Sequence, residues 1–229
     1  MLKFEGCTFS AMGANKSDQV YGLKITGTED VSIKDCVFNG MGYAAILNNG
    51  AGALTIEGTE FQCGSIKNPI EGSQIVDNGN VTVDHCDFVG VPGNNFINFY
   101  QVADGSVHTI SNCKFAGSTS NNVIRLSNKT SAAAIFNISN CKYEFVSGKV
   151  SDYTGFILCQ DYTNRNGVKQ DFSKYTVNIT NLTRPEEGSL IYVYEDGEGI
   201  IVSNYPAVTV DGSPIVFAGG EDMTEEEEN

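Results

Sequence analysis

The chain has 229 residues, of which 41% are hydrophobic and 18% are charged, and its formal net charge is −14. The hydrophobic fraction excludes a disordered chain, and a composition rich in Gly and free of Trp excludes a coiled coil or helical bundle. We expect no nucleic-acid partner, because no basic stripe is present to neutralise phosphates, and no membrane span, because no apolar run reaches about 20 residues.

A six-residue motif recurs along the chain. Its copies are FEGCTF (4–9), IKDCVF (33–38), IEGTEF (56–61), VDHCDF (83–88), ISNCKF (110–115), ISNCKY (138–143) and a weaker ITNLTR (179–184). The fourth position of each copy is Cys7, Cys36, Thr59, Cys86, Cys113, Cys141 and Leu182. The spacing between copies is nearly regular, and such self-similarity predicts a repeat architecture.

A second, apolar element alternates with this motif along the whole chain. Its central residues are Leu23, Ile46, Ile75, Ile97, Ile124, Ile157, Ile191 and Ile215. Neither element shows a 3.6-residue apolar period of helical length, so both are predicted to be short strands separated by polar turns.

The spacing inside the first motif predicts a corner. Val83 and Cys86 are three residues apart, so a straight strand would point them to opposite faces. Both point inward only if the chain bends just before the cysteine position. The residue preceding that position is Gly6, Asp35, Gly58, His85, Asn112, Asn140 and Asn181 in the seven copies. These residue types tolerate the left-handed backbone region, which predicts one such residue at every corner.

With its regular repeats, its left-handed corners and its recurring Ile, Cys and Phe positions, the chain resembles the right-handed parallel β-helix, or pectate-lyase-like, superfamily. Members of this superfamily are found among tailed-phage virion proteins. The resemblance implies an all-β, single-domain solenoid of about eight coils over residues 1–219, with a long loop insertion at 144–174 and an acidic tail at 220–229. The fold serves polysaccharide lyases and hydrolases, virion proteins and adhesins, so it indicates architecture and not function.

The cysteines fit one inward-facing structural ladder, together with the phenylalanines two residues later. The predicted ladder contains Cys7, Cys36, Cys86, Cys113, Cys141, Phe9, Phe38, Phe61, Phe88 and Phe115. Thr59 and Leu182 occupy the cysteine position in two copies, so a thiol is not required there. We interpret the cysteines as buried free thiols, which suits a reducing compartment, and no CxxC pair supports a metal site.

Four outward acids are the candidate catalytic groups under an enzymatic interpretation. Glu57 and Asp84 share one column, and Glu60 and Asp87 share another, about 4.8 Å apart if the repeats stack. Such pairs could act in a retaining glycosidase or hold Ca²⁺. We expect no cofactor other than Ca²⁺, and we expect Ca²⁺ only under this enzymatic interpretation. The competing interpretation is a solvated strand face, and no Arg lies in a matching position beside them. His85 fits a corner, and His108 begins a strand beside apolar residues.

The insertion supplies the candidate binding residues. The step from Cys141 to Leu182 is 41 residues, longer than its neighbours, and the extra segment is rich in aromatic and polar side chains. The binding candidates are Tyr153, Asp161, Tyr162, Arg165 and Lys169. They could contact a cell-surface glycan or a protein partner, or form an ordinary loop. The acidic tail is expected to be solvated or to dock on a basic surface.

We therefore expect a non-enzymatic structural or attachment protein, and the resemblance implies a head decoration, fibre or tail component of a tailed-phage virion, made in the host cytoplasm. The N-terminus lacks a signal-peptide pattern and a capping helix. We expect that end to be covered by another subunit of an assembly, as in a homo-oligomer, or by further residues that precede Met1. The alternative is a carbohydrate-active or glycan-binding β-helix, a polysaccharide lyase or hydrolase located outside the cell or on its surface.

Overall fold

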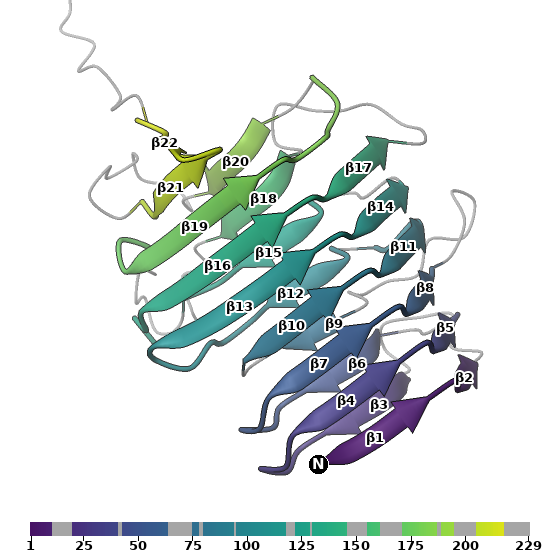
Figure 1. Ribbon diagram of the computed structural model, residues 1–229. Coiled ribbons are helices and arrows are strands. Elements are labelled where there is room, and N and C mark those ends of the chain that lie inside the picture. The colour runs from purple at the N-terminus through teal and green to yellow at the C-terminus, as the bar shows by residue number, and fades with distance from the viewer. Residues whose placement is uncertain are drawn as a thin grey trace, which may run out of the picture.

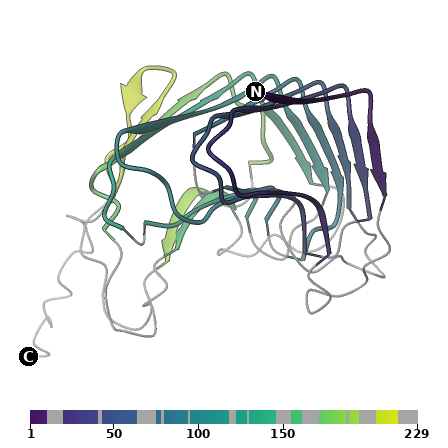
Figure 2. The same ribbon diagram turned by 90° about the horizontal axis from the view of Figure 1, so that it is seen from below.

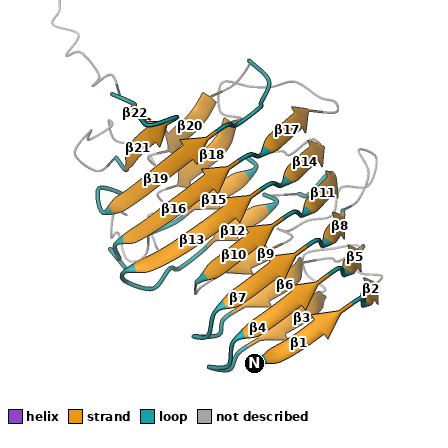
Figure 3. Cartoon of the chain, in the orientation of Figure 1, coloured by secondary structure: helices purple, strands orange, loops and turns teal. Residues whose placement is uncertain are grey.

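The computed structural model describes residues 1–10, 20–40, 43–63, 75–77, 80–93, 95–117, 122–128, 130–145, 155–160, 171–186, 189–194 and 205–217. These residues form strands and turns, and they contain no helix (Figure 3). The strands form three sheets whose rungs stack in a solenoid-like arrangement (Figure 1). The all-β, parallel architecture predicted from the repeats is confirmed.

Successive strands of each sheet come from successive repeats. Sheet A contains β1 (Leu2–Glu5), β4 (Val31–Lys34), β7 (Leu54–Glu57), β10 (Val81–Asp84), β13 (Ser106–Ser111), β16 (Ala134–Ser139), β19 (Tyr175–Thr180), β21 (Ala207–Val210) and β22 (Ser213–Pro214). Sheet B contains β2 (Thr8–Ser10), β5 (Val37–Asn39), β8 (Glu60–Gln62), β11 (Asp87–Gly90), β14 (Lys114–Gly117) and β17 (Lys142–Phe145). Sheet C contains β3 (Tyr21–Ile25), β6 (Ala44–Asn48), β9 (Ile75–Asp77), β12 (Ile97–Phe99), β15 (Ile124–Leu126), β18 (Gly155–Gln160) and β20 (Ser189–Tyr194).

The three sheets surround one interior when the stack is viewed from below (Figure 2). Pairing is parallel and in register, so that equivalent residues of successive repeats lie side by side. Val81 pairs with Leu54, and Val83 pairs with Ile56. In sheet A the inward side chains are buried and alternate with outward side chains that meet solvent, as in the buried–exposed pattern of β7.

Every predicted corner between sheet A and sheet B has the expected backbone. The positive φ angles are 62° at Gly6, 50° at Asp35, 58° at Gly58, 49° at His85, 53° at Asn112, 52° at Asn140 and 50° at Asn181. A residue in this region turns the chain sharply while strand geometry resumes on both sides. The prediction of a left-handed corner residue in all seven copies is confirmed.

Stacked side chains fill the interior next to this corner. Phe9, Phe38, Phe61, Phe88 and Phe115 form a column of nearly parallel rings with centroids 4.6 to 5.2 Å apart. The phenylalanines from Phe38 onward are fully buried, and burying each side chain contributes about 1.5–3 kcal/mol. Aromatic stacking therefore adds to the backbone hydrogen bonds in holding each repeat against the next.

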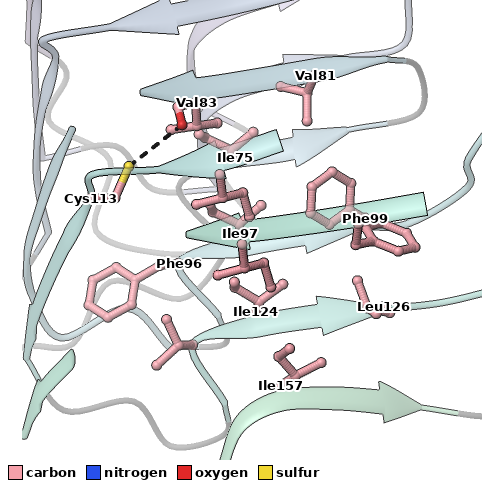
Figure 4. Close-up of a cluster of buried hydrophobic side chains, with 14 of the residues drawn as sticks. Ile75, Val81, Val83, Phe96, Ile97, Phe99, Cys113, Ile124, Leu126 and Ile157 are labelled. Carbon is pink, nitrogen blue, oxygen red and sulfur yellow. Dashed lines mark hydrogen bonds between the residues drawn. The ribbon is translucent and has the colours of Figure 1, made fainter. Parts of the chain in front are cut away.

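The cysteines line the same interior beside the phenylalanine column. All seven are free thiols, and Cys36, Cys86, Cys113 and Cys141 are buried. Their thiols donate to backbone carbonyls, as Cys113 Sγ does to Val83 O on the preceding repeat at 3.7 Å (Figure 4). Burial raises the pKa of the Cys159 thiol, in sheet C, to about 12, so this thiol stays protonated.

Apolar side chains of sheet C complete the core. Ile75, Ile97, Ile124 and Ile157 lie one above another on successive strands, facing the interior (Figure 4). Seven of the eight central residues predicted for the second element lie in this sheet, from Leu23 in β3 to Ile191 in β20. The inserted step of the repeat therefore still contributes β18 to sheet C.

The eighth predicted element does not join sheet C. Asp211 and Gly212 have φ angles of 48° and 79°, and two successive positive φ angles form a tight hairpin turn. The chain therefore reverses, β22 pairs antiparallel with β21, and the Ile215 N–H donates to Val208 O at 2.9 Å. The prediction that placed Ile215 in the second element is wrong, because the Asp-Gly pair makes a hairpin where earlier copies make a single-residue corner.

Candidate functional site

The four candidate acids lie on both sides of the corner between sheets A and B. Glu57 on β7 pairs in register with Asp84 on β10, and Glu60 on β8 pairs with Asp87 on β11. Each pair therefore shares one column, as the repeat predicts. The two pairs belong to different sheets, so the geometry offers two separate pairs on the outside of the solenoid.

The sheet A pair is already engaged in contacts between repeats. Lys34 Nζ lies 3.2 Å from Glu57 Oε1. Asp84 accepts hydrogen bonds from Ser111 Oγ at 2.6 Å and Asn112 Nδ2 at 2.8 Å, and its other oxygen lies 2.7 Å from His85 Nδ1. Partial burial raises the pKa of the Asp84 carboxyl, but these hydrogen bonds outweigh it and lower the pKa to about 2. Asp84 is therefore ionised at neutral pH and suits hydrogen-bond acceptance better than proton donation.

The sheet B pair belongs to a column of side chains that is acidic at Glu60 and Asp87 and becomes basic at Lys114 on the next strand. Glu60 accepts a hydrogen bond from Gln62 Nε2 at 2.6 Å. Asp87 pairs in register with Lys114, and Lys114 Nζ lies 3.3 Å from Glu144 Oε2. The described residues include no group of three or more His, Cys, Asp or Glu side chains arranged to hold a metal ion.

The corner carries a continuous chain of hydrogen-bonded side chains, which we call the corner ladder: the Asp84 carboxylate and the amides of Asn112, Asn140 and Asn181. Asn140 Nδ2 donates to Asn112 Oδ1 at 3.2 Å, and Asn181 Nδ2 donates to Asn140 Oδ1 at 2.9 Å. With the Asn112–Asp84 bond, each amide passes a hydrogen bond to the preceding repeat. The left-handed backbone and the amides of the ladder therefore come from the same residues, and Asp84 directly precedes the left-handed corner residue of its own repeat, His85.

A second polar group, absent from the sequence predictions, lies inside the solenoid. We call it the interior cluster: Asn48, Asp77, Ser106 and His108. Asn48 Nδ2 donates to Asp77 Oδ1 at 2.6 Å, His108 Nδ1 lies 3.8 Å from Asp77 Oδ2, and Ser106 Oγ lies 2.9 Å from His108 Nε2. Asn48 and Asp77 come from sheet C, while Ser106 and His108 come from sheet A. The cluster thus links two sheets across the interior.

Ser106, His108 and Asp77 have the composition of a catalytic triad but lie in a closed environment. Ser106 is 4% exposed, His108 1% and Asp77 0%. Burial lowers the pKa of His108 to about 4, so its imidazole is neutral at pH 7. The ring stacks on Phe136 with centroids 4.9 Å apart. A substrate cannot reach the hydroxyl unless the sheets separate, so the cluster acts as a structural link.

One signal in the sequence points to this cluster, and it lies in the inward column of sheet A that contains His108. The column otherwise contains apolar residues, such as Val81 before His108 and Phe136 after it. One polar residue in an apolar column predicts a buried partner. The partner itself could not be named, because Asp77 lies on another sheet and 31 residues earlier in the chain.

The predicted binding residues lie outside the described part of the chain. They are Tyr153, Asp161, Tyr162, Arg165 and Lys169. The acidic tail at 220–229 also lies outside it. In the part that is described, no helix is long and apolar enough to cross a membrane. Comparison with protein-family models, curated proteins and solved structures finds no match to this chain.

Proposed function

We propose that the chain is a right-handed parallel β-helix of about eight coils that acts as a non-enzymatic structural or attachment protein. The observation that carries the proposal is the set of side-chain ladders that join one repeat to the next. The phenylalanine column connects them inside, and the corner ladder connects them outside. Such repeated contacts suit a stiff, elongated body.

The contacts of the candidate acids also favour this proposal. Glu57 is paired with Lys34, and Asp84 accepts hydrogen bonds that hold its pKa near 2. A retaining glycosidase needs one carboxyl that stays protonated to act as an acid, and the contacts of Asp84 oppose this. These acids therefore serve the stacking of the repeats better than they serve proton transfer.

We further propose that the protein is a virion component of a tailed bacteriophage, made in the host cytoplasm and located in a head decoration, fibre or tail. The support is the resemblance of its repeat to β-helices of such virions, together with seven free cysteines, which suit folding in a reducing compartment. Its partners are then other subunits of the assembly, including further copies of itself.

The test is mass spectrometry of purified virions from the source of the gene, combined with labelling of particles by an antibody against this chain. We expect the protein at a fixed number of copies per particle. Its absence from purified particles would overturn the virion assignment. In parallel, the pure protein is incubated with a panel of polysaccharides. Release of reducing ends or unsaturated products, lost in Glu57→Gln or Asp84→Asn, would instead support a polysaccharide lyase or hydrolase.

A further inference from the structure

The outward face of sheet A changes character along the stack. Each of the first four strands carries a charged side chain on this face, such as Lys3 on β1, Lys34 on β4, Glu57 on β7 and Asp84 on β10. The outward residues of β13, β16, β19 and β21 are all uncharged. We call this second part the neutral face, and its main residues are Val107, Thr109, Ile135, Asn137, Asn178 and Thr209.

The neutral face presents hydrogen-bonding groups in a regular column. Asn137 pairs in register with Thr109 on one side and with Asn178 on the other. Asn178 Nδ2 donates to Asn137 Oδ1 at 3.0 Å, and Thr209 Oγ1 donates to Asn178 Oδ1 at 3.0 Å. These bonds fix the orientation of both amides. The Asn137 amide nitrogen, which donates to no described residue, is left for a ligand.

Aliphatic side chains flank this column. Val107 is 48% exposed and Ile135 is 40% exposed, and they pair in register on neighbouring strands. Hydroxyl, amide and aliphatic groups therefore alternate over one surface without any charge. The opposite side of the same strands packs in the core through Phe136, Ile138 and Val177. The surface is thus preorganised, which reduces the entropy lost on binding.

We propose that the neutral face binds an uncharged polysaccharide. Hydroxyls and amides can donate to and accept from sugar hydroxyls, and the aliphatic side chains can cover the apolar faces of sugar rings. Charge selects among polysaccharides, because the neutral face has no cationic side chain with which to hold an acidic glycan. This inference rests on the proposed attachment role and names the class of receptor that the attachment would use.

The test uses two matched lysine substitutions in one outward column of sheet A. Thr109→Lys places a charge on the neutral face, and Thr55→Lys places the same charge on β7, in the charged part. Affinity electrophoresis measures binding of each protein to dextran, galactomannan and amylopectin, with polygalacturonate as the acidic probe. We expect at least one neutral polymer to retard the wild type, and Thr109→Lys to weaken that binding about tenfold while Thr55→Lys changes it less than about twofold.

Asn137→Ala is the second variant, since it removes a free donor without adding charge, and thermal unfolding checks that all variants fold. No retardation by any neutral polymer, equal effects of the two lysines, or a preference for polygalacturonate would overturn the proposal. A wild-type dimer in light scattering that Thr109→Lys converts to a monomer, without glycan binding, would also overturn it, since the occupant would be a second copy. Glycan binding by a protein absent from virions would overturn only the proposed virion role.

Discussion

The interior cluster and the corner ladder use similar polar groups in opposite environments. In the interior cluster, Asp77 and His108 are fully buried between two sheets. In the corner ladder, Asn112 and Asn140 are exposed at the outer edge of the solenoid. Water can replace a hydrogen bond lost at the corner, but nothing replaces one lost inside. The same chemistry should therefore stabilise the two places by different amounts.

The two groups also connect different parts of the fold. The corner ladder joins consecutive repeats along the stack, parallel to the backbone hydrogen bonds of the sheets. The interior cluster brings side chains of sheet A and sheet C together across the core. Apolar packing and the buried hydrogen bond from Tyr175 Oη to Ser127 O, at 2.7 Å, also connect the two sides. The contact of the cluster that crosses the core is the 3.8 Å approach of His108 Nδ1 to Asp77 Oδ2, and His108 Nδ1 has no hydrogen-bond partner among the described residues. The cluster is therefore a buried polar contact between the sheets that is only partly satisfied.

The largest expected effect comes from removing a donor inside. Asn48→Ala deletes the amide that donates to Asp77 at 2.6 Å and accepts from the Gly50 N–H at 3.0 Å. A buried carboxyl then loses its close donor, and we expect the free energy of unfolding to fall by about 4 kcal/mol, measured by urea denaturation. The control is Asn39→Ala, on the exposed side of β5, which should change it by less than about 0.5 kcal/mol. Equal losses would contradict the comparison.

As the pH is lowered, the interior cluster should lose its contribution to the free energy of unfolding at a higher pH than the corner ladder does. Burial lowers the pKa of His108 from its ordinary 6.5 to about 4, while Asp77 Oδ2, at 3.8 Å, is too distant for a hydrogen bond to reverse this. Below pH 6.5 the unfolded chain therefore binds a proton that the folded chain resists. Stability should fall by up to about 3 kcal/mol as the pH drops from 6.5 to 4.

The matched variant for this pH effect is His108→Phe, which continues the apolar column between Val81 and Phe136. Urea unfolding at several pH values should show that its stability depends less on pH between 6.5 and 4 than that of the wild type. If the variant and the wild type lose stability in parallel over this range, His108 is not the group responsible.

A corner substitution should have a smaller effect with two separable parts. Asn140→Ala removes two hydrogen bonds of the corner ladder, those to Asn112 and from Asn181, and places alanine at φ 52°. We expect a loss of about 1–2 kcal/mol in thermal or urea unfolding. Asn140→Gly removes the same two hydrogen bonds, but glycine adopts a positive φ without strain. It should recover most of the loss, because exposed hydrogen bonds contribute little. A glycine variant as unstable as the alanine variant would show that the ladder bonds dominate.

The repeat predicted the corners and columns because both depend on local spacing. The three-residue step from Val83 to Cys86, with His85 between them, required a left-handed residue, and the structure has one there at φ 49°. Contacts that cross the interior depend on which repeat faces which, and sequence spacing does not encode this. The sequence therefore indicated that His108 is unusual in its column but could not supply Asp77.

The C-terminal hairpin shows a second limit of spacing arguments. Asp211 continues the series of corner residues and has the same positive φ, so the repeat extends to it. Gly212, the next residue, also takes a positive φ, which converts a corner into a reversal. The apolar residues that follow resemble the second element in composition, but the turn directs them back along β21 and not into sheet C. The neutral face, in contrast, can be predicted from the sequence. When the copies of the repeat are aligned, the outward positions of the later sheet A strands contain no charged residue.

The smallest expected effect is at Asp84, the first member of the corner ladder. Its hydrogen bonds hold the pKa of the carboxyl near 2, below the ordinary 3.8, so its contribution is complete above about pH 4 and is lost as the pH falls toward 2. Because the side chain is partly exposed, we expect Asp84→Asn to cost only about 1 kcal/mol at pH 7, measured by urea unfolding. The difference between wild type and variant should shrink as the pH falls below about 4 and vanish near pH 2. A difference that persists unchanged at pH 2 would show that the ionised Asp84 carboxyl is not the source of the stability that the variant loses.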